Sequence, residues 1–222
     1  MDTYNKILSI DVNESMSKYD KLKKYQLNHV ENFYFSSYDF IYNKKEKEDI
    51  NFDNLIEHLV KRKHGLCVEL TYCFGSFLRY KGYTIKFISN YKGQVPINTF
   101  IPHCALFVYL DDKIYYVDVA SGIIANILEP INILEENALE TMKYGFDKSN
   151  DAFEIILHGG ATAIAKYNKY IDDSYMKKAY YWIYSSTFIN RQGLSKTASI
   201  VLKNNGLYSM CDATEETAKL FM

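Results

Sequence analysis

The spacing of apolar residues predicts that the chain is mostly helical from residue 1 to about residue 62. One apolar stripe with helical periodicity is formed by Leu22, Tyr25, Gln26 and His29. Ser15 or Ser17 precedes this stripe, and serine is a favoured helix N-cap because its oxygen accepts a hydrogen bond from a free backbone N–H. A further helix is expected to begin at residues 51–53 and to turn Leu55 and Leu59 inward.

A helix from about Cys67 to Lys81 is the element that the pattern predicts most clearly. Its apolar side carries Leu70, Phe74, Phe77 and Leu78. Gly82 then ends the helix, because glycine readily adopts the left-handed conformation found at helix C-termini. Gly65 lets the chain turn sharply into the helix. The prediction therefore places Cys67 in the first helical turn.

The periodicity then changes to the alternation that is typical of β-strands. Strands are expected over residues 84–89, 104–110 and 114–119, with a loop over residues 91–102. The last two strands form a hairpin whose turn lies at residues 111–113.

The length of this hairpin turn decides which side chains meet. A two-residue turn pairs Leu110 with Lys113. Asp118 then lies opposite Ala105, and His103 is two residues further along the same face, within reach of a hydrogen bond. A three-residue turn would move Asp118 and His103 to opposite faces.

The pattern weakens after Gly122. We expect a strand over residues 153–157, closed by residues 158–160, and a short helix over residues 215–221. The segment 175–185 mixes aromatic and basic residues and is compatible with a helix or a strand.

Composition places the chain among folded proteins. Of the 222 residues 48% are hydrophobic and 16% aromatic, which is enough for a substantial core. The formal net charge of −1 gives no overall basic field for nucleic acid or anionic lipid. The sequence has neither an apolar run of about 18 residues nor the apolar core of a signal peptide. We therefore expect a cytoplasmic protein with no nucleic-acid or membrane partner.

The cysteines are Cys67, Cys73, Cys104 and Cys211, and no two of them form a Cys-x-x-Cys pair. Their spacing favours neither a zinc site nor a disulfide framework, so we expect no bound metal. Free cysteines are commonly small core residues, which fits Cys73 and Cys104. Taken alone, Cys67 would also more often be structural than catalytic.

Cys67, His103 and Asp118 together form a candidate catalytic triad. A thiolate is the reactive form of cysteine, and both a helix N-terminus and a nearby imidazolium favour it. The helix start provides the first of these to Cys67, and His103 would provide the second by taking its proton. Asp118 would orient the imidazole. A carboxylate in the apolar strand around Asp118 is costly to bury unless it is paired, which favours such a role.

Two other polar residues leave alternatives open. Glu69 follows Cys67 by two residues, and it either pairs with a basic group that supports the site or faces solvent. His29 lies on an apolar stripe, where a packing histidine is more common than a ligand.

Three segments resemble motifs of the arylamine N-acetyltransferase family. Residues 61–70 are similar to its Arg-Gly-Gly-x-Cys-x-Glu-x-Asn segment, with Cys67 at the cysteine. Residues 103–112 resemble its His-x-x-Leu-x-Val strand and turn, and residues 114–122 resemble its Tyr-x-Val-Asp-Val-Gly-Phe-Gly strand. The order Cys, His, Asp agrees, and the similarity covers roughly residues 1–125.

The resemblance implies an α+β fold around a triad core like that of cysteine proteases. It implies a helical N-terminal lobe, a central antiparallel β-barrel and a small C-terminal α/β lid. We place the helical lobe at residues 1–82, the barrel at residues 83–160 and the lid region at residues 161–222.

The resemblance also implies an acyltransferase that works through Cys67, His103 and Asp118. In the family, acetyl-CoA acylates the cysteine, CoA leaves, and an arylamine or hydrazine takes the acetyl group in a ping-pong sequence. Gly122, at the end of the third segment, is the candidate contact with this co-substrate.

The chain departs from the family pattern at several positions. The arginine and the first glycine of the family are Lys63 and His64 here, and its asparagine is Thr71. Its Gly-Phe-Gly corresponds to residues 120–122, where Ser121 replaces the aromatic residue. The part beyond Gly122 is shorter than usual. These differences concern the acceptor and the CoA contacts and leave the triad intact.

Alternatives of other classes use the same residues. The triad would also serve an amide synthase, a cyclase or a thiol hydrolase, and Ser121 would suit a larger or more polar substrate. A non-catalytic binding domain is the third class. The sequence predicts neither the acceptor nor the oligomeric state.

Overall fold

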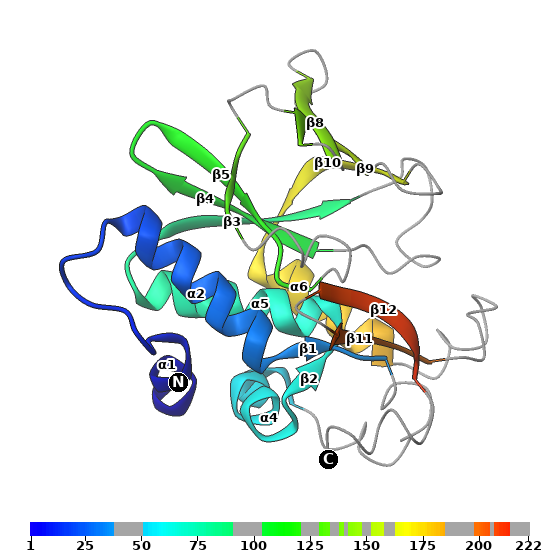
Figure 1. Ribbon diagram of the computed structural model, residues 1–222. Helices are drawn as coiled ribbons and strands as arrows, with labels where there is room; N and C mark the ends of the chain where they lie inside the picture. The colour runs from blue at the N-terminus through cyan, green and yellow to red at the C-terminus, as the bar shows by residue number, and fades with distance from the viewer. Residues whose placement is uncertain are drawn as a thin grey trace.

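The protein combines a group of helices with one large antiparallel sheet, as the computed structural model shows (Figure 1). The structure describes residues 1–37, 51–90, 104–120, 129–133, 138–139, 142–147, 152–157, 163–184, 198–204 and 207–213. His103 and Gly122 lie outside these residues, as do the loop predicted over residues 91–102 and the helix predicted over residues 215–221.

The N-terminal helices follow the predicted apolar stripes. They are α1 (Asp2–Leu8), α2 (Lys18–Asn32), the 3-10 helix η2 (Phe52–Asn54) and α4 (Leu55–Arg62). All four residues of the predicted stripe in α2 are buried. Ser17 is the N-cap of α2, and its side chain accepts a hydrogen bond from the backbone N–H of Asp20. Among the described residues of this part of the chain, the predicted helical character is therefore confirmed.

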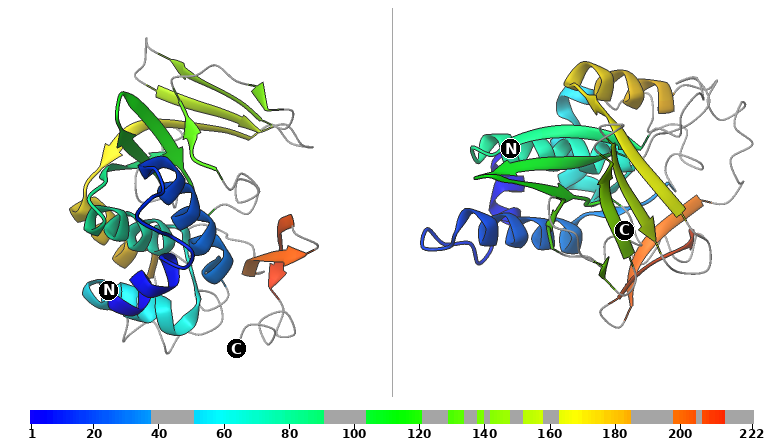
Figure 2. Two further views of the ribbon diagram at one scale, coloured as in Figure 1. Left: turned by 60° about the vertical axis from the view of Figure 1, so that its left-hand side comes forward. Right: turned by 90° about the horizontal axis from the view of Figure 1, so that it is seen from above.

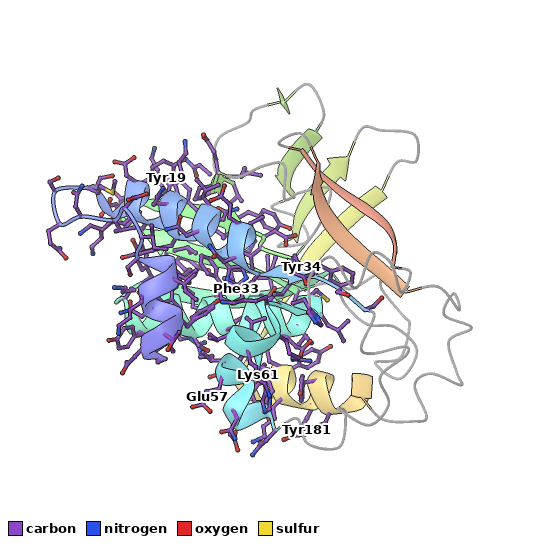
Figure 3. All side chains as sticks on the ribbon, turned by 60° about the horizontal axis from the view of Figure 1, so that its bottom comes forward. Tyr19, Phe33, Tyr34, Glu57, Lys61 and Tyr181 are labelled. Atoms are coloured by element: carbon purple, nitrogen blue, oxygen red, sulfur yellow. The ribbon has the colours of Figure 1, made fainter. Side chains whose placement is uncertain are left out.

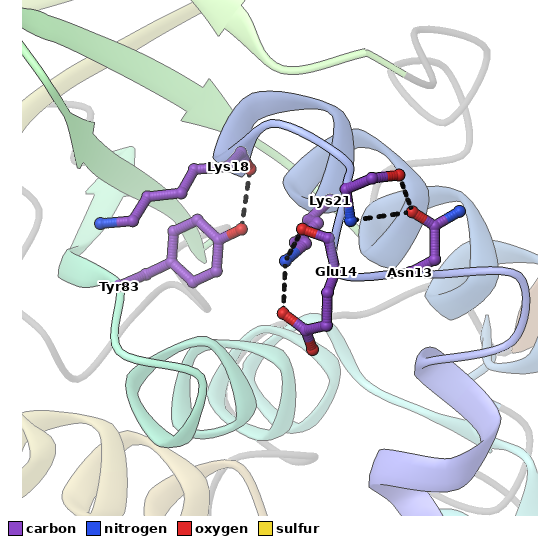
Figure 4. Close-up of polar contacts among 6 residues, drawn as sticks. Asn13, Glu14, Lys18, Lys21 and Tyr83 are labelled. Carbon is purple, nitrogen blue, oxygen red and sulfur yellow. Dashed lines mark hydrogen bonds and ion pairs between the residues drawn. The ribbon is translucent and has the colours of Figure 1, made fainter.

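Polar contacts fix the start of α2 (Figure 4). The ammonium of Lys21 lies 3.1 Å from the carboxylate of Glu14, in the loop before the helix. The hydroxyl of Tyr83 donates a hydrogen bond of 2.7 Å to the backbone carbonyl of Lys18. The second contact links α2 to the residues between α5 (Cys67–Tyr80) and β3 (Thr84–Asn90).

α5 (Cys67–Tyr80) confirms the predicted central helix, and Gly82 follows it with a φ of +80°. A Cβ atom at Gly75 would lie 2.6 Å from the ring of Phe87 and 3.1 Å from the side chain of Leu106. Glycine at this position therefore lets α5 approach the sheet closely.

Eight strands form one antiparallel sheet in the order β6-β5-β4-β3-β10-β9-β8-β7. They are β3 (Thr84–Asn90), β4 (Cys104–Leu110), β5 (Lys113–Val117), β6 (Ile131–Asn132), β7 (Ala138–Leu139), β8 (Met142–Asp147), β9 (Ala152–Leu157) and β10 (Ala163–Ile171). Two further views show the sheet beside the helices (Figure 2). The strands predicted over residues 84–89, 104–110 and 153–157 are thus confirmed. Among the described strands, β6 and β7 are the two edges of an open ladder. The α+β class is shown, and closure into a barrel remains a prediction.

The C-terminal part of the chain adds strands to the sheet and a helix to the group of helices. β10 lies between β3 and β9, and it is followed by α6 (Asp173–Tyr184), which shows that the ambiguous segment 175–185 begins as a helix. Arg79 of α5 binds both carboxylate oxygens of Asp173 at 2.7 and 2.8 Å. β11 (Ala198–Asn204) and β12 (Leu207–Ala213) form a separate hairpin. The three-lobe division and the lid remain predictions.

A short pair of parallel strands lies beside the N-terminal end of α5. β1 (Tyr34–Phe35) pairs with β2 (His64–Gly65). Figure 3 shows Phe33 and Tyr34 where α2 leads into β1, with Glu57 and Lys61 on the outer side of α4. This pair brings the end of α2 beside the residues that lead into α5.

Candidate active site

Cys67 is the first residue of α5, as predicted, and 7% of its surface is exposed. The thiol therefore lies at the helix end whose first backbone N–H groups have no intrahelical partner. The partial positive charge at this end favours an anion. The helix start thus provides the first condition for a reactive thiolate.

Glu69 holds the turn that leads into this helix. Its Oε2 accepts a hydrogen bond of 2.6 Å from the backbone N–H of Leu66, and its Oε1 lies 2.9 Å from Nη2 of Arg62. The side chain of Glu69 is 1% exposed and that of Arg62 is 13% exposed. Of the two roles left open by the sequence, pairing with a basic group is therefore the correct one.

Gly65 makes room for Glu69. A Cβ atom at Gly65 would lie 3.0 Å from Oε2 of Glu69 and 3.3 Å from its Cβ. The left-handed residue of the turn is Lys63, with a φ of 64°, rather than Gly65. Gly65 thus allows a close approach of Glu69, and the sharp turn ascribed to Gly65 from the sequence takes place at Lys63.

The β4–β5 hairpin brings Asp118 toward the same region. Leu110 pairs with Lys113, and the register continues to Leu106 opposite Val117. The predicted two-residue turn is therefore confirmed. The ladder ends at the pair of Leu106 and Val117, because the strand predicted over residues 114–119 ends at Val117 as β5 (Lys113–Val117). Asp118 directly follows the strand, and its place opposite Ala105 remains a prediction.

The carboxylate of Asp118 is buried and bonded on both oxygens. Oδ1 accepts a hydrogen bond of 2.8 Å from the backbone N–H of Ala120, and Oδ2 accepts one of 3.0 Å from the hydroxyl of Tyr116. The backbone carbonyl of Asp118 accepts a hydrogen bond of 3.3 Å from Nε2 of Gln26 in α2. These contacts hold the carboxylate in a fixed orientation.

Cys104 connects the helix start with the hairpin. Its carbonyl accepts a hydrogen bond of 2.9 Å from Oγ1 of Thr71, which lies one helical turn after Cys67 on the same side of α5. Burial raises the pKa of the Cys104 thiol, and the charges of Cys67 and Asp118 raise it further. Cys67 and Asp118 therefore both lie near the first residue of β4.

His103 directly precedes Cys104 in the sequence and lies outside the described residues. The structure thus brings two of the three predicted site residues to the start of β4, and the place of His103 remains a prediction. Gly122 also lies outside the described residues. Burial raises the pKa of the Cys73 thiol as well, which agrees with its predicted core role.

Sequence reasoning missed the residues that support the site. They are Gln26, Arg62, Thr71 and Tyr116. The available signals were weak: Gln26 is a polar residue within an apolar stripe, and Tyr116 shares the strand face of Asp118. Arg62 carried no signal, because the family pattern has its arginine one position later, where this chain has Lys63.

His29 has the packing role that the sequence favoured. It is fully buried among aromatic rings, and its Nδ1 lies 2.7 Å from the hydroxyl of Tyr4. Burial lowers its pKa from 6.5 to about 3. His29 therefore stays neutral at physiological pH and contributes to the fold rather than to acid–base chemistry.

No group of three or more potential metal ligands occurs among the residues that the structure describes. Within the same residues, none of the helices has the length and apolar character needed to cross a membrane.

Comparison with known proteins identifies the class to which this fold and site belong. The N-acetyltransferase family model matches residues 18–163, and the chain belongs to this family. The prediction from the sequence motifs is thus confirmed. The matched part contains α2, the start of α5 and the whole β4–β5 hairpin.

Solved arylamine N-acetyltransferases share the fold. The chain is similar to arylamine N-acetyltransferase C from Bacillus anthracis, with a TM-score of 0.70, 17% identity, and coverage of 95% of this chain and 84% of that one. The enzyme from Nocardia farcinica gives a TM-score of 0.69 at 16% identity, with coverage of 99% and 88%. An arylamine N-acetyltransferase from Bacillus cereus, described as having a unique Cys-His-Glu catalytic triad, gives 0.62 at 15% identity, with coverage of 97% and 92%.

A sequence relative comes from a giant virus. An uncharacterized acetyltransferase of Acanthamoeba polyphaga mimivirus is 24% identical over 136 residues, which are 60% of this chain. The match spans 62% of the length of that relative.

Proposed function

We propose that the protein transfers an acetyl group from acetyl-CoA, through a thioester on Cys67, to an amine acceptor that resembles an arylamine. One observation carries this proposal: Cys67 begins α5 in a buried turn, and the charges of both Cys67 and Asp118 act on the buried thiol of Cys104 at the start of β4. Membership of the N-acetyltransferase family supports the same assignment.

In the first half of the reaction, His103 takes the proton of Cys67 and the resulting thiolate attacks the acetyl carbonyl carbon. Backbone N–H groups at the start of α5, including that of Cys67, are placed to stabilise the oxyanion. The bond between the carbonyl carbon and the CoA sulfur then breaks, and CoA leaves with the proton of the imidazolium. Cys67 is left as an acetyl thioester.

In the second half, the nitrogen of the acceptor attacks the thioester. His103 accepts the proton of the amine, and the thiolate of Cys67 leaves as the amide forms. Asp118 stabilises the imidazolium in both halves. An acceptor amine must therefore reach the thioester as its free base.

A hydrolase or an amide synthase on the same triad is the second candidate. Ser121, which stands where the family has an aromatic residue, would leave a more open and more polar acceptor region. Such a site would admit water or a larger acyl substrate.

Release of CoA, measured with and without an acceptor, tests the proposal. We expect acetyl-CoA turnover to depend on an added arylamine or hydrazine, and to be absent in Cys67→Ala. Equal turnover without any amine would show a hydrolase. If Cys67 reacts rapidly with iodoacetamide and acetyl-CoA is not consumed, the acyl donor differs from the one proposed.

A further inference from the structure

Tyr116 lies in β5, which ends at Val117, directly before the proposed triad aspartate. It pairs with Phe107 in the β4–β5 ladder, and Asp118 follows it by two residues. Its hydroxyl donates a hydrogen bond of 3.0 Å to Oδ2 of Asp118, and both residues are 1% exposed. The contact is therefore shielded from water.

The donors to the Asp118 carboxylate described above are neutral groups. The hydroxyl of Tyr116 and the backbone N–H of Ala120 each bond one oxygen. Neutral donors stabilise a buried carboxylate without cancelling its charge, whereas an arginine or lysine would compensate that charge. These two donors therefore stabilise the carboxylate without cancelling its negative charge.

The family motif does not specify this residue. In the Tyr-x-Val-Asp pattern the fixed tyrosine corresponds to Tyr115, and Tyr116 occupies the variable position. Tyr115 points to the other side of the sheet, where its ring lies 5.1 Å from that of Tyr19. The hydroxyl beside Asp118 is therefore a feature of this chain and not of the motif.

We propose that Tyr116 is a positioning residue, whose hydroxyl holds the Asp118 carboxylate ionised and in the orientation that stabilises the imidazolium of His103. This inference rests on the proposed triad and adds to it a residue that acts through Asp118. It predicts that the reactivity of Cys67 depends on a hydroxyl group that never touches the substrate.

The test compares Tyr116→Phe with Tyr115→Phe, a matched loss of one hydroxyl from the neighbouring residue on the opposite face. The readout is the rate at which iodoacetamide alkylates Cys67 between pH 5 and pH 9, followed by peptide mass spectrometry. We expect Tyr116→Phe to slow alkylation at pH 7 about tenfold, which is the scale of one lost hydrogen bond to a charged group. We also expect the pH midpoint of alkylation to rise, and Tyr115→Phe to match the wild type in rate and midpoint.

Equal rates and midpoints in Tyr116→Phe and Tyr115→Phe would overturn the inference while leaving the triad in place. A wild-type Cys67 that alkylates like an ordinary thiol would overturn the triad and the inference together. If Tyr116→Phe does not fold, 3-fluorotyrosine at position 116 keeps both the ring and the hydroxyl. Alkylation at least as fast as in the wild type is then expected, and a tenfold loss would contradict the proposal.

Discussion

The two sides of the site are built in different ways. The turn before Cys67 is held by Glu69, whose partners Leu66 and Arg62 lie three and seven residues away in the sequence. The Asp118 side relies on the contact between Gln26 and Asp118, which spans 92 residues, and on that between Thr71 and Cys104, which spans 33. Short loops cost less entropy to close, so the nucleophile side can form locally. The hairpin side requires the whole fold.

The chemistry of the two sides also differs. An ion pair between Arg62 and Glu69 stabilises the helix start, whereas the donors described for Asp118 are a hydroxyl and a backbone N–H. The helix start is thus held by an ion pair, and the described contacts of Asp118 are neutral hydrogen bonds. Variants of either side should therefore separate stability from activity.

The largest effect is expected on the hairpin side. Asp118→Asn keeps the shape of the side chain and removes its charge, so we expect acetyl transfer to fall about a thousandfold or more, as in other triads. Asp112→Asn, at the exposed turn of the same hairpin, is the matched control. Turnover of acetyl-CoA with an arylamine measures the effect, and a loss smaller than tenfold in Asp118→Asn would refute the role of Asp118.

The helix side should instead lose stability. Arg62→Met removes the ion pair of a buried carboxylate, and we expect the free energy of unfolding to fall by roughly 4 kcal/mol. Urea denaturation measures this loss, with Lys61→Met on the exposed side of α4 as the control. The double variant Arg62→Met/Glu69→Gln should regain part of the lost stability. If its loss equals the sum of the losses in Arg62→Met and Glu69→Gln, the two residues are not coupled.

His29 is a buried residue of α2, the helix that also carries Gln26, and its protonation should destabilise the fold. Because the pKa of His29 falls from 6.5 to about 3 on folding, the unfolded chain binds a proton between these values that the folded protein does not. This contribution to stability is present above pH 6.5 and is lost as the pH falls toward 3. We expect a loss of about 3 kcal/mol at pH 4. The free energy of unfolding of His29→Gln, measured by urea denaturation at several pH values, should lack this part of the pH dependence. The same pH dependence in the variant and the wild type would contradict the prediction.

The smallest effect is expected at the hydrogen bond between Thr71 and Cys104, which links the helix side to the hairpin side. Thr71→Val removes the hydroxyl that bonds the carbonyl of Cys104, and we expect it to lower the free energy of unfolding by about 1–2 kcal/mol. Thr71→Ser retains a hydroxyl and should recover most of the loss in the same denaturation experiment. A Thr71→Val protein as stable as Thr71→Ser would show that the bond contributes nothing.

The sequence predicted much of the local structure. Helical periodicity and Gly82 located α5, and alternation with a two-residue turn located the β4–β5 hairpin and its register. These features depend on neighbours in the chain. The place of β10 between β3 and β9 could not be predicted, because strand order depends on contacts between distant segments.

The same distinction applies to the site. Cys67 at a helix start follows from local pattern, whereas the contact between Gln26 and Asp118 appears only once α2 packs on the hairpin. The sequence also carried no sign that Arg62 supports the site, because the arginine of the family pattern corresponds to Lys63. Arg62 is the last residue of α4 and binds Glu69, and Lys63 follows it in a left-handed conformation.

Intact mass after mixing with acetyl-CoA tests the central claim, acylation of Cys67, most directly. We expect one added acetyl group, located on the Cys67 peptide, absent in Cys67→Ala and removed when an arylamine is added. Cys104→Ala, a change at the neighbouring buried thiol, should still acquire the group. An adduct that persists in Cys67→Ala, or no adduct on a folded wild-type protein, would contradict acylation of Cys67.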